Sequence, residues 1–280
     1  MKKILVVTDF SDVADHAVDY ACNLANKLNI EHLFLLNTYE NIPIYDSGEA
    51  GSLALSMQEA DELEQSRIES FQLLKQHLAH QLHTTTVLVP LIINDALPDA
   101  VNQVCREEDI DLVIIGIKRQ DDLETLILGS NIRKAVDRIH YPVLLIPRCA
   151  SIAVPQNVIL AAPFREPLTR AIQIKLHKFL YRFNGKVTAI HRCIKGALNE
   201  KESKIANELQ LQLQHYNCPL QIIKDVKDLP AAINEYASNN SPSLVISIHK
   251  MRGFIAGLFH KSVTKSLAWR CDVPLLVLHM

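Results

Sequence analysis

The sequence predicts an α/β protein built from two tandem, doubly wound, Rossmann-like domains, each with a parallel sheet. Its 280 residues exceed the roughly 100 to 200 residues of a usual single domain, so two domains of similar size are expected. Short apolar runs rich in β-branched residues alternate with longer helical stretches, which is the pattern of parallel strands buried on both faces. The same order of runs then returns in the second half of the chain.

The first half contains five strand-like runs and four helical stretches. Several of the helices open after residues that can cap a helix N-terminus, such as serine, aspartate or asparagine. Alternation of five strands with four helices is typical of a doubly wound α/β domain. The expected strands are residues 4–7, 33–36, 87–92, 112–115 and 143–146, and the expected helices are 12–29, 53–82, 97–107 and 131–139.

The second half repeats this order, and two local matches set the register between the halves. The segment IDLVIIGI corresponds to SPSLVISI, and YPVLLIP corresponds to VPLLVLH. Pairing Pro142 with Pro274 and Ser130 with Ser262 gives the same offset of 132 residues both times. A link at 147–156, with two prolines and no apolar period, separates domains expected at 1–148 and 155–280. The expected strands of the repeat are 158–161, 187–190, 220–223, 244–248 and 275–278.

The last strand of each half is expected at the edge of its sheet. VLLI and LLVL carry no charge that would oppose pairing with another edge strand. We therefore expect these two strands to pair with each other, so that the halves form an internal pseudo-dimer about an approximate two-fold axis. The alternative is that a helix or loop covers each edge.

Composition limits the classes of partner and compartment. A formal net charge of −2 gives no electrostatic reason to expect nucleic acid or an anionic membrane as partner. The apolar run after MKK ends at Thr8 and Asp9, too early for a signal peptide or a membrane span. The six cysteines show no CxxC spacing, so neither a disulfide framework nor a zinc ribbon is expected. A reducing cytoplasm is the expected location.

Four segments of the chain resemble the universal stress protein (UspA) family. ILVVTDFSDVADHAVDYACNLA is similar to the first strand and helix of that family, including the aspartate after the strand. GIKRQDDLETLILGSN resembles its glycine signature, in which two glycines separated by two residues are followed nine residues later by Gly-Ser or Gly-Thr. YPVLLIP resembles its closing strand, and GLFHKSVTKSLAWRCDVPLLVLH resembles the end of tandem members. The resemblance covers nearly the whole chain.

The resemblance implies the strand order 3-2-1-4-5 and, in the nucleotide-binding branch of the family, ATP with magnesium at the carboxyl ends of strands one and four. Reversal of strand order opens a crevice there, and the following helix N-terminus offers N–H groups to phosphate. Asp9 would accept a hydrogen bond from the adenine amino group, although a turn or capping aspartate is the alternative reading. The expected nucleotide-binding residues are Thr8, Asp9, Phe10, Asn37, Gly116, Lys118, Arg119, Gly129, Ser130 and Asn131.

The chain departs from the signature in both halves. Arg119 stands where the second glycine belongs, and its side chain would either clamp phosphate, exclude ATP, or remain a solvated loop charge. In the second half, Pro163 falls where Asp9 is expected, Ser247 where Gly116 is expected and Lys261 where Gly129 is expected, while Ser262 is retained. ATP binding is therefore expected in the first half alone.

The leading functional hypothesis is a stress-response protein in which a nucleotide in the first half acts as a regulatory switch, with at most slow ATP hydrolysis. One alternative is a nucleotide-independent interaction scaffold with an unknown protein partner. Another is a binder of a hydrophobic ligand through the second-half loop HKMRGFIAGLFHK, whose apolar residues would otherwise pack on the core. Further dimerisation of the tandem chain stays open. An adenine-nucleotide hydrolase ranks last, because TDFSDVAD lacks a glycine-serine phosphate loop.

Neither a metal site nor a catalytic group emerges from the remaining polar patterns. His77, His80 and His83 recur every three residues, but on a helix they spread over about 120 degrees, and no carboxylate or cysteine lies near in sequence. Ser11 and His16 beside Asp9 do not make a triad, since helical positions five apart lie on different faces. No catalytic residue and no metal ligand are expected.

Overall fold

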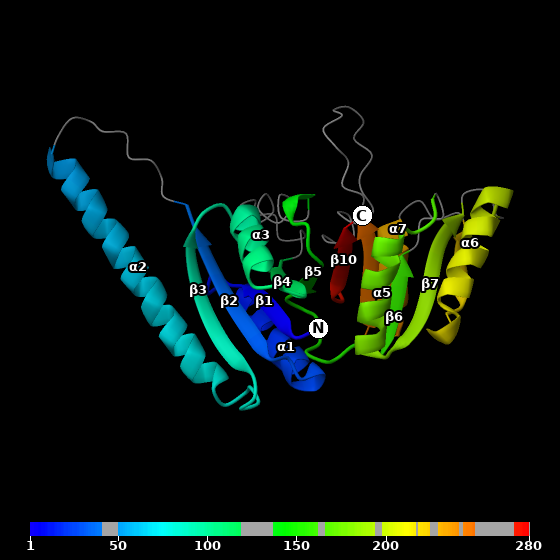
Figure 1. The fold of residues 1–280 in the computed structure, drawn as a ribbon, viewed down its shortest axis with the longest axis horizontal. Coiled ribbons are helices and arrows are strands. Elements are labelled where there is room, and N and C mark those ends of the chain that lie inside the picture. The colour runs from blue at the N-terminus through cyan, green and yellow to red at the C-terminus, as the bar shows by residue number, and fades with distance from the viewer. Residues whose placement is uncertain are drawn as a thin grey trace.

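The structure is a computed structural model, shown as a ribbon in Figure 1. It describes residues 1–40, 50–118, 137–161, 166–193, 198–216, 218–224, 229–240, 243–249 and 272–279. Within these residues the chain is an α/β protein built on one continuous sheet of ten strands. The predicted fold class is confirmed.

The ten strands follow the same order in each half. The first half has the order β3-β2-β1-β4-β5 and the second has β8-β7-β6-β9-β10, so the predicted order 3-2-1-4-5 is confirmed twice. Each expected strand is present, and most extend one or two residues beyond the apolar run. The strands are β1 (Lys3–Val7), β2 (His32–Tyr39), β3 (Val87–Asn94), β4 (Leu112–Ile117), β5 (Val143–Pro147), β6 (Asn157–Ala161), β7 (Lys186–Cys193), β8 (Leu220–Lys224), β9 (Ser243–His249) and β10 (Leu275–His279).

The two halves join through their last strands. β5 and β10 pair antiparallel, with Leu275 opposite Leu145 and Val277 opposite Val143, whereas every other pairing in the sheet is parallel. These two strands lie side by side at the centre of Figure 1, with α2 and α6 at the two ends. The predicted internal pseudo-dimer is confirmed, and the strands bury their apolar side chains against each other and against the helices.

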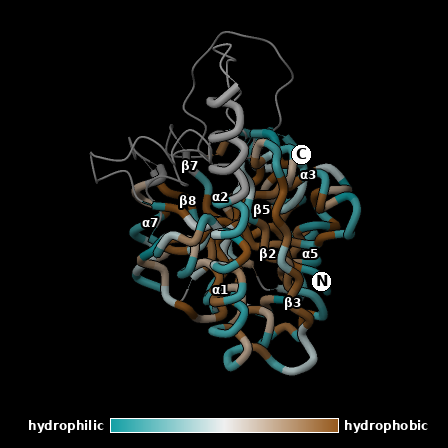
Figure 2. Tube along the Cα trace, turned by 90° about the vertical axis from the view of Figure 1, so that its left-hand side faces the viewer, coloured by the Kyte–Doolittle hydropathy of each residue, from teal (hydrophilic) through white to brown (hydrophobic). Residues whose placement is uncertain are grey.

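Helices cover both faces of the sheet. One core contains side chains of α1, α2, α5 and α6, and the other contains side chains of α3 and α7. Figure 2 shows the hydrophobic strands enclosed by helices whose outer positions are hydrophilic. The expected helix 131–139 lies outside the described residues except at its end. The helices are α1 (Asp12–Leu28), α2 (Ala50–Leu78), α3 (Leu97–Glu107), α5 (Arg170–Phe183), α6 (Glu200–Gln212) and α7 (Leu229–Asn239).

The first helix of each half is bounded by the same pair of signals. Ser11 caps the N-terminus of α1 by accepting a hydrogen bond from Ala14, and Thr169 caps α5 in the same way. Both helices end at an asparagine in the left-handed conformation, Asn29 and Asn184, a residue type that tolerates positive φ. The repeat therefore extends to the local hydrogen bonds that start and stop these helices.

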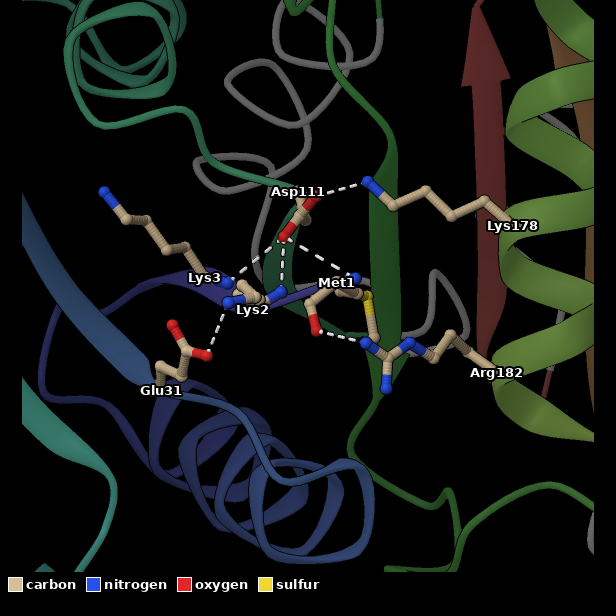
Figure 3. Close-up of polar contacts among 7 residues, drawn as sticks. All are labelled: Met1, Lys2, Lys3, Glu31, Asp111, Lys178 and Arg182. Atoms are coloured by element: carbon tan, nitrogen blue, oxygen red, sulfur yellow. Dashed lines mark hydrogen bonds and ion pairs between the residues drawn. The ribbon is translucent and has the colours of Figure 1, made fainter.

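A partly buried carboxylate connects the two halves near the amino ends of β1 and β4. Figure 3 shows Asp111 accepting from the backbone N–H groups of Lys2 (2.5 Å) and Lys3 (3.2 Å) and forming an ion pair with Lys178 of α5. The Arg182 guanidinium, one turn further along α5, donates to the Met1 carbonyl at 3.0 Å. These contacts hold α5 of the second half against β1 and β4 of the first.

The electrostatics of Asp111 predict how its contribution depends on pH. Burial by itself would raise the pKa, but the hydrogen bonds from Lys178, Lys2 and Lys3 outweigh burial and hold the pKa below its ordinary value of 3.8. A pKa lowered by folding contributes stability above the unfolded pKa, and the contribution is lost as the pH falls through the folded pKa. The ionised carboxylate thus stabilises the junction at neutral pH.

We predict that Asp111→Asn lowers the free energy of unfolding by about 1–2 kcal/mol at pH 7, because a charge-assisted contact is lost. Urea titrations at a series of pH values should show this difference shrinking below pH 4 or so, since the wild-type carboxyl then protonates too. Asp95→Asn, at an exposed aspartate, is the control and should change the free energy by less than about 0.5 kcal/mol. A difference that stays constant down to acid pH would contradict the assignment.

Candidate functional site

The sequence predicted a site at the carboxyl ends of β1 and β4, and the end of β2 lies beside that of β1. The β1–α1 turn is linked to β2 by a hydrogen bond from the backbone N–H of Thr8 to the Leu36 carbonyl, at 2.8 Å. Thr8 is buried. Within the turn, the Thr8 hydroxyl accepts from the N–H of Phe10, which has a φ of 61°. A positive φ is unusual for an aromatic residue, so the surrounding contacts must hold this turn in place.

Asp9 lies at the crest of this turn and is exposed. Its Oδ1 accepts from the backbone N–H of Ser11 at 3.1 Å and from the Ser11 hydroxyl at 2.5 Å. Because Ser11 also caps α1, the carboxylate orients the cap, which is the turn role considered as the alternative reading. Among the described residues Oδ2 has no hydrogen-bond partner, so the same carboxylate can still accept a bond from a ligand.

Asn37, at the carboxyl end of β2, carries a buried polar atom without a partner. Its amide nitrogen donates to the Thr8 carbonyl at 2.8 Å, which locks the exit of β1 against β2. The side chain is 6% exposed, and its Oδ1 makes no hydrogen bond within the described part of the chain. An unsatisfied buried acceptor costs about 1–3 kcal/mol, so this atom favours a donor brought by a ligand.

Helix α2 supplies an aromatic and cationic wall that the sequence analysis did not identify. The Phe10 ring meets Phe71 edge to face, with ring centroids 5.0 Å apart. One turn earlier on α2, the Arg67 guanidinium lies 4.3 Å from the centre of the Tyr39 ring at the end of β2. Arg67 and Phe71 are four residues apart on a predicted helix and so share one face. That spacing was the sequence signal from which this wall could have been found.

Gly116 has a structural reason to be glycine that needs no ligand. A Cβ added there would lie 2.4 Å from the Val13 carbonyl oxygen in the first turn of α1. The glycine therefore lets the start of α1 pack directly on β4. Its predicted role as a point of close approach for a nucleotide stays a prediction, since the close approach that the structure shows is that of the helix backbone.

Part of the predicted site lies outside the described residues. This part comprises Arg119, Gly129, Ser130 and Asn131. Lys118, directly after β4, is described and partly buried. The structure thus brings Thr8, Asp9, Phe10 and Asn37 together around one turn and places Gly116 behind it, against α1.

In the second half, the sheet register corrects one correspondence. β4 and β9 pair with β1 and β6 in matching registers, which places Ile115 with Ser247 and Gly116 with Ile248, not Gly116 with Ser247. An isoleucine fits there because α5 begins later than α1. The residue that matches Val13 is Pro167, by the same offset of 154 residues that relates Lys3 to Asn157, and Pro167 precedes the helix.

The remaining polar groups show no second centre in the described residues. His77 contacts Gln81 at 2.9 Å and lies 3.9 Å from Asp19, and no group of three or more metal-ligating side chains occurs within the described ranges. None of the described helices combines the length and apolar character needed to cross a bilayer.

Comparison with known proteins identifies the family of this chain. The model of the universal stress protein family matches residues 1–147, which is more than half of the chain. The chain belongs to the universal stress protein family. Two universal stress proteins of Methanocaldococcus jannaschii each match 52% of the chain: MJ0531 is 22% identical over 147 residues, 82% of its length, and MJ0577 is 26% identical over 156 residues, 95% of its length.

A solved structure extends the likeness to both halves of this universal stress protein. A universal stress protein from Archaeoglobus fulgidus superposes with a TM-score of 0.68 over 99% of this chain and 98% of its own. The two sequences are 15% identical, so the likeness establishes the fold alone. The second half, which the family model does not match, thus shares the fold of that structure.

We predict that Gly116→Ala lowers the free energy of unfolding by about 1–3 kcal/mol, because its new methyl group would press on the Val13 carbonyl. Ile117→Val, on the next residue of β4, is the control and should cost about 0.5–1.5 kcal/mol through lost burial alone. Urea denaturation measures both. An alanine variant as stable as wild type would show that α1 does not pack on β4 as described.

Proposed function

We propose that the first half of this universal stress protein binds an adenine nucleotide, ATP with magnesium, at the carboxyl edge of β1, β2 and β4. The nucleotide acts as a regulatory switch in a stress response and is not the substrate of efficient catalysis. On this proposal, residues 1–148 form the nucleotide-binding domain, and residues 155–280 form a second domain whose signature has degenerated.

The observation that carries the proposal is the pair of acceptor atoms around the β1–α1 turn. Asp9 Oδ2 is exposed to a ligand, and Asn37 Oδ1 is a buried acceptor with no donor in the described structure. An exocyclic amino group carries donor hydrogens that such oxygens accept. Phe10, on the same turn, and Tyr39, at the end of β2, add aromatic surface at this edge, as ligand sites usually provide.

The predicted phosphate contacts complete the proposal. Lys118 and Arg119 would supply positive charge after β4, and Gly129, Ser130 and Asn131 would present N–H groups and a hydroxyl. In the second half, Ile248 carries a side chain where Gly116 has none, and Pro163 stands in place of Asp9. One nucleotide per chain is therefore the proposed stoichiometry.

The nucleotide-independent scaffold is the second candidate, and one observation favours it. Gly116 is fully accounted for by the packing of α1 on β4, so its presence does not require a nucleotide. The hydrophobic-ligand alternative rests on 249–261, nearly all of which lies outside the described residues. Titration with nucleotide distinguishes the proposed site from both alternatives, because neither alternative involves nucleotide binding.

We predict that calorimetric titration of nucleotide-stripped protein with magnesium ATP shows one site per chain. Asp9→Ala and Asn37→Leu should each weaken binding by about tenfold or more, the equivalent of about 1.4 kcal/mol for one lost hydrogen bond. Asp95→Ala is the matched control, because Asp95 is also an exposed aspartate after a strand, accepting from the next backbone N–H at 2.7 Å. Its affinity should equal that of wild type.

Arg119→Gly decides the role of the departure from the family signature. Weaker binding would make the arginine a phosphate clamp. Absence of binding in wild type, with binding gained in this variant, would show that the arginine closes the site and would favour the scaffold. Absence of binding in both proteins would overturn the nucleotide proposal.

A further inference from the structure

The helices α1 and α5 occupy equivalent places in the two halves but carry opposite charge. α1 contains three aspartates and one lysine, and Asp9 precedes it. α5 contains two arginines and two lysines and no acidic residue. The internal repeat therefore yields a face of the molecule that is acidic on one side and basic on the other.

Both helices cover the same face of the sheet, and the link between the halves crosses that face. His16 of α1 contacts the Ala150 carbonyl at 2.9 Å, and Arg148 contacts Asp12 at 3.2 Å. At its other end, the Gln156 carbonyl accepts from Lys186, just beyond α5, at 2.8 Å. The link thus runs from the first turns of α1 to the end of α5. We call this surface, formed by 12–28, 148–156 and 170–183, the α1/α5 face.

Large apolar side chains are exposed on this face. Ile152 in the link is 41% exposed, and Ile174 and Tyr181 on α5 are 62% and 78% exposed. Ile174 and Tyr181 are seven residues apart, which places them on one stripe of the helix together with Arg170 and Lys178. Isolated exposed apolar residues are ordinary on a protein surface, but these three share one face with two complementary charged helices.

Like charges gather on the α1 side strongly enough to disturb one another. Burial first, and then the neighbouring carboxylates, Asp19 and Asp12 foremost, raise the pKa of Asp15. Arg148 and His77 contact two of these aspartates, while Asp111 contacts Lys178 on the other side. These internal contacts reduce the charge of each side without reversing its sign.

We propose that the α1/α5 face is a docking surface for a second copy of this chain, with α1 of each copy against α5 of the other. A two-fold axis parallel to the sheet and running between the helices turns the face over and exchanges the two sides. Acidic α1 then meets basic α5 twice, and Ile152 lies near the axis, where a residue meets its own copy. If α1 and α5 carried charges of the same sign, the two copies would repel each other in this arrangement.

The dimensions of the face limit the surface area that the association can bury. The 17 residues of α1 span about 25 Å and the 14 of α5 about 21 Å. Two helix contacts of this length and about 10 Å width bury on the order of 1,000 Å² in total, the low end for a specific interface. For an interface of this size we expect a dimer that exchanges with monomer in about the micromolar range and weakens with salt, because its charges are at the surface.

The test uses the full chain and two charge reversals in sedimentation equilibrium. Asp15→Lys with Asp19→Lys makes α1 basic, and Arg170→Glu, Ala171→Glu and Lys175→Glu together make α5 net acidic, with three glutamates against Lys178 and Arg182. Acidic residues at 170 and 171 also suit a helix N-terminus, and the α1 changes relieve repulsion among aspartates, so both proteins are expected to fold. Glu64→Lys with Glu69→Lys, on the exposed side of α2, is the matched control, and circular dichroism verifies the fold of each variant.

In low salt we expect wild type and the α2 control to dimerise, with twice the chain mass of 31.5 kDa. Near 0.5 M salt the dissociation constant of the dimer should rise by about tenfold. Each reversed variant alone should be monomeric, since its two helices have like charge. An equimolar mixture should recover the dimer, because basic α1 of one variant meets acidic α5 of the other.

Three results would each overturn the proposal. Wild type could remain monomeric at about 100 µM in low salt, a concentration far above a micromolar dissociation constant. A dimer that persists in both reversed variants would use another surface. Folded variants that stay monomeric when mixed would show that the charges of α1 and α5 do not face each other across the interface.

Discussion

The antiparallel pairing of β5 with β10 is the interaction on which the rest of the molecule depends. Each half ends in a strand without charge, and Val143, Leu144 and Leu145 are fully buried once the strands pair. An exposed edge of this kind would present unpaired backbone groups next to apolar side chains. Pairing the two edges within one chain satisfies both and converts two five-stranded sheets into one of ten strands.

The same pairing sets the two-fold relation between the halves, and with it the placement of every later feature. It brings α5 beside the amino ends of β1 and β4, where Lys178 and Arg182 reach Asp111 and the Met1 carbonyl. It also leaves α1 and α5 on one face. The duplicated halves have then diverged in charge on that face, so symmetry of the backbone and asymmetry of the surface occur together.

Divergence of the halves is equally clear at the carboxyl edge of the sheet. In the first half α1 begins at Asp12, and its first turn leaves no room for a side chain at Gly116. In the second half α5 begins one turn later, and Ile248 occupies the matching position. A shift of one helical turn therefore explains why one half requires glycine at this position whereas the other accommodates isoleucine.

The sequence by itself determined the elements, the duplication and the edge pairing of this universal stress protein. Apolar β-branched runs, helix caps and the repeat can all be read from neighbouring residues. A parallel sheet buried on both faces requires apolar residues along each strand, so its strands are visible in the sequence. Tertiary structure alone decided which polar atoms are left for a ligand, because Asn37 Oδ1 becomes an orphan only when β1 and β2 are side by side. It also decided the role of Gly116 and the contribution of Arg67 and Phe71, since each depends on a helix packing against residues distant in the chain.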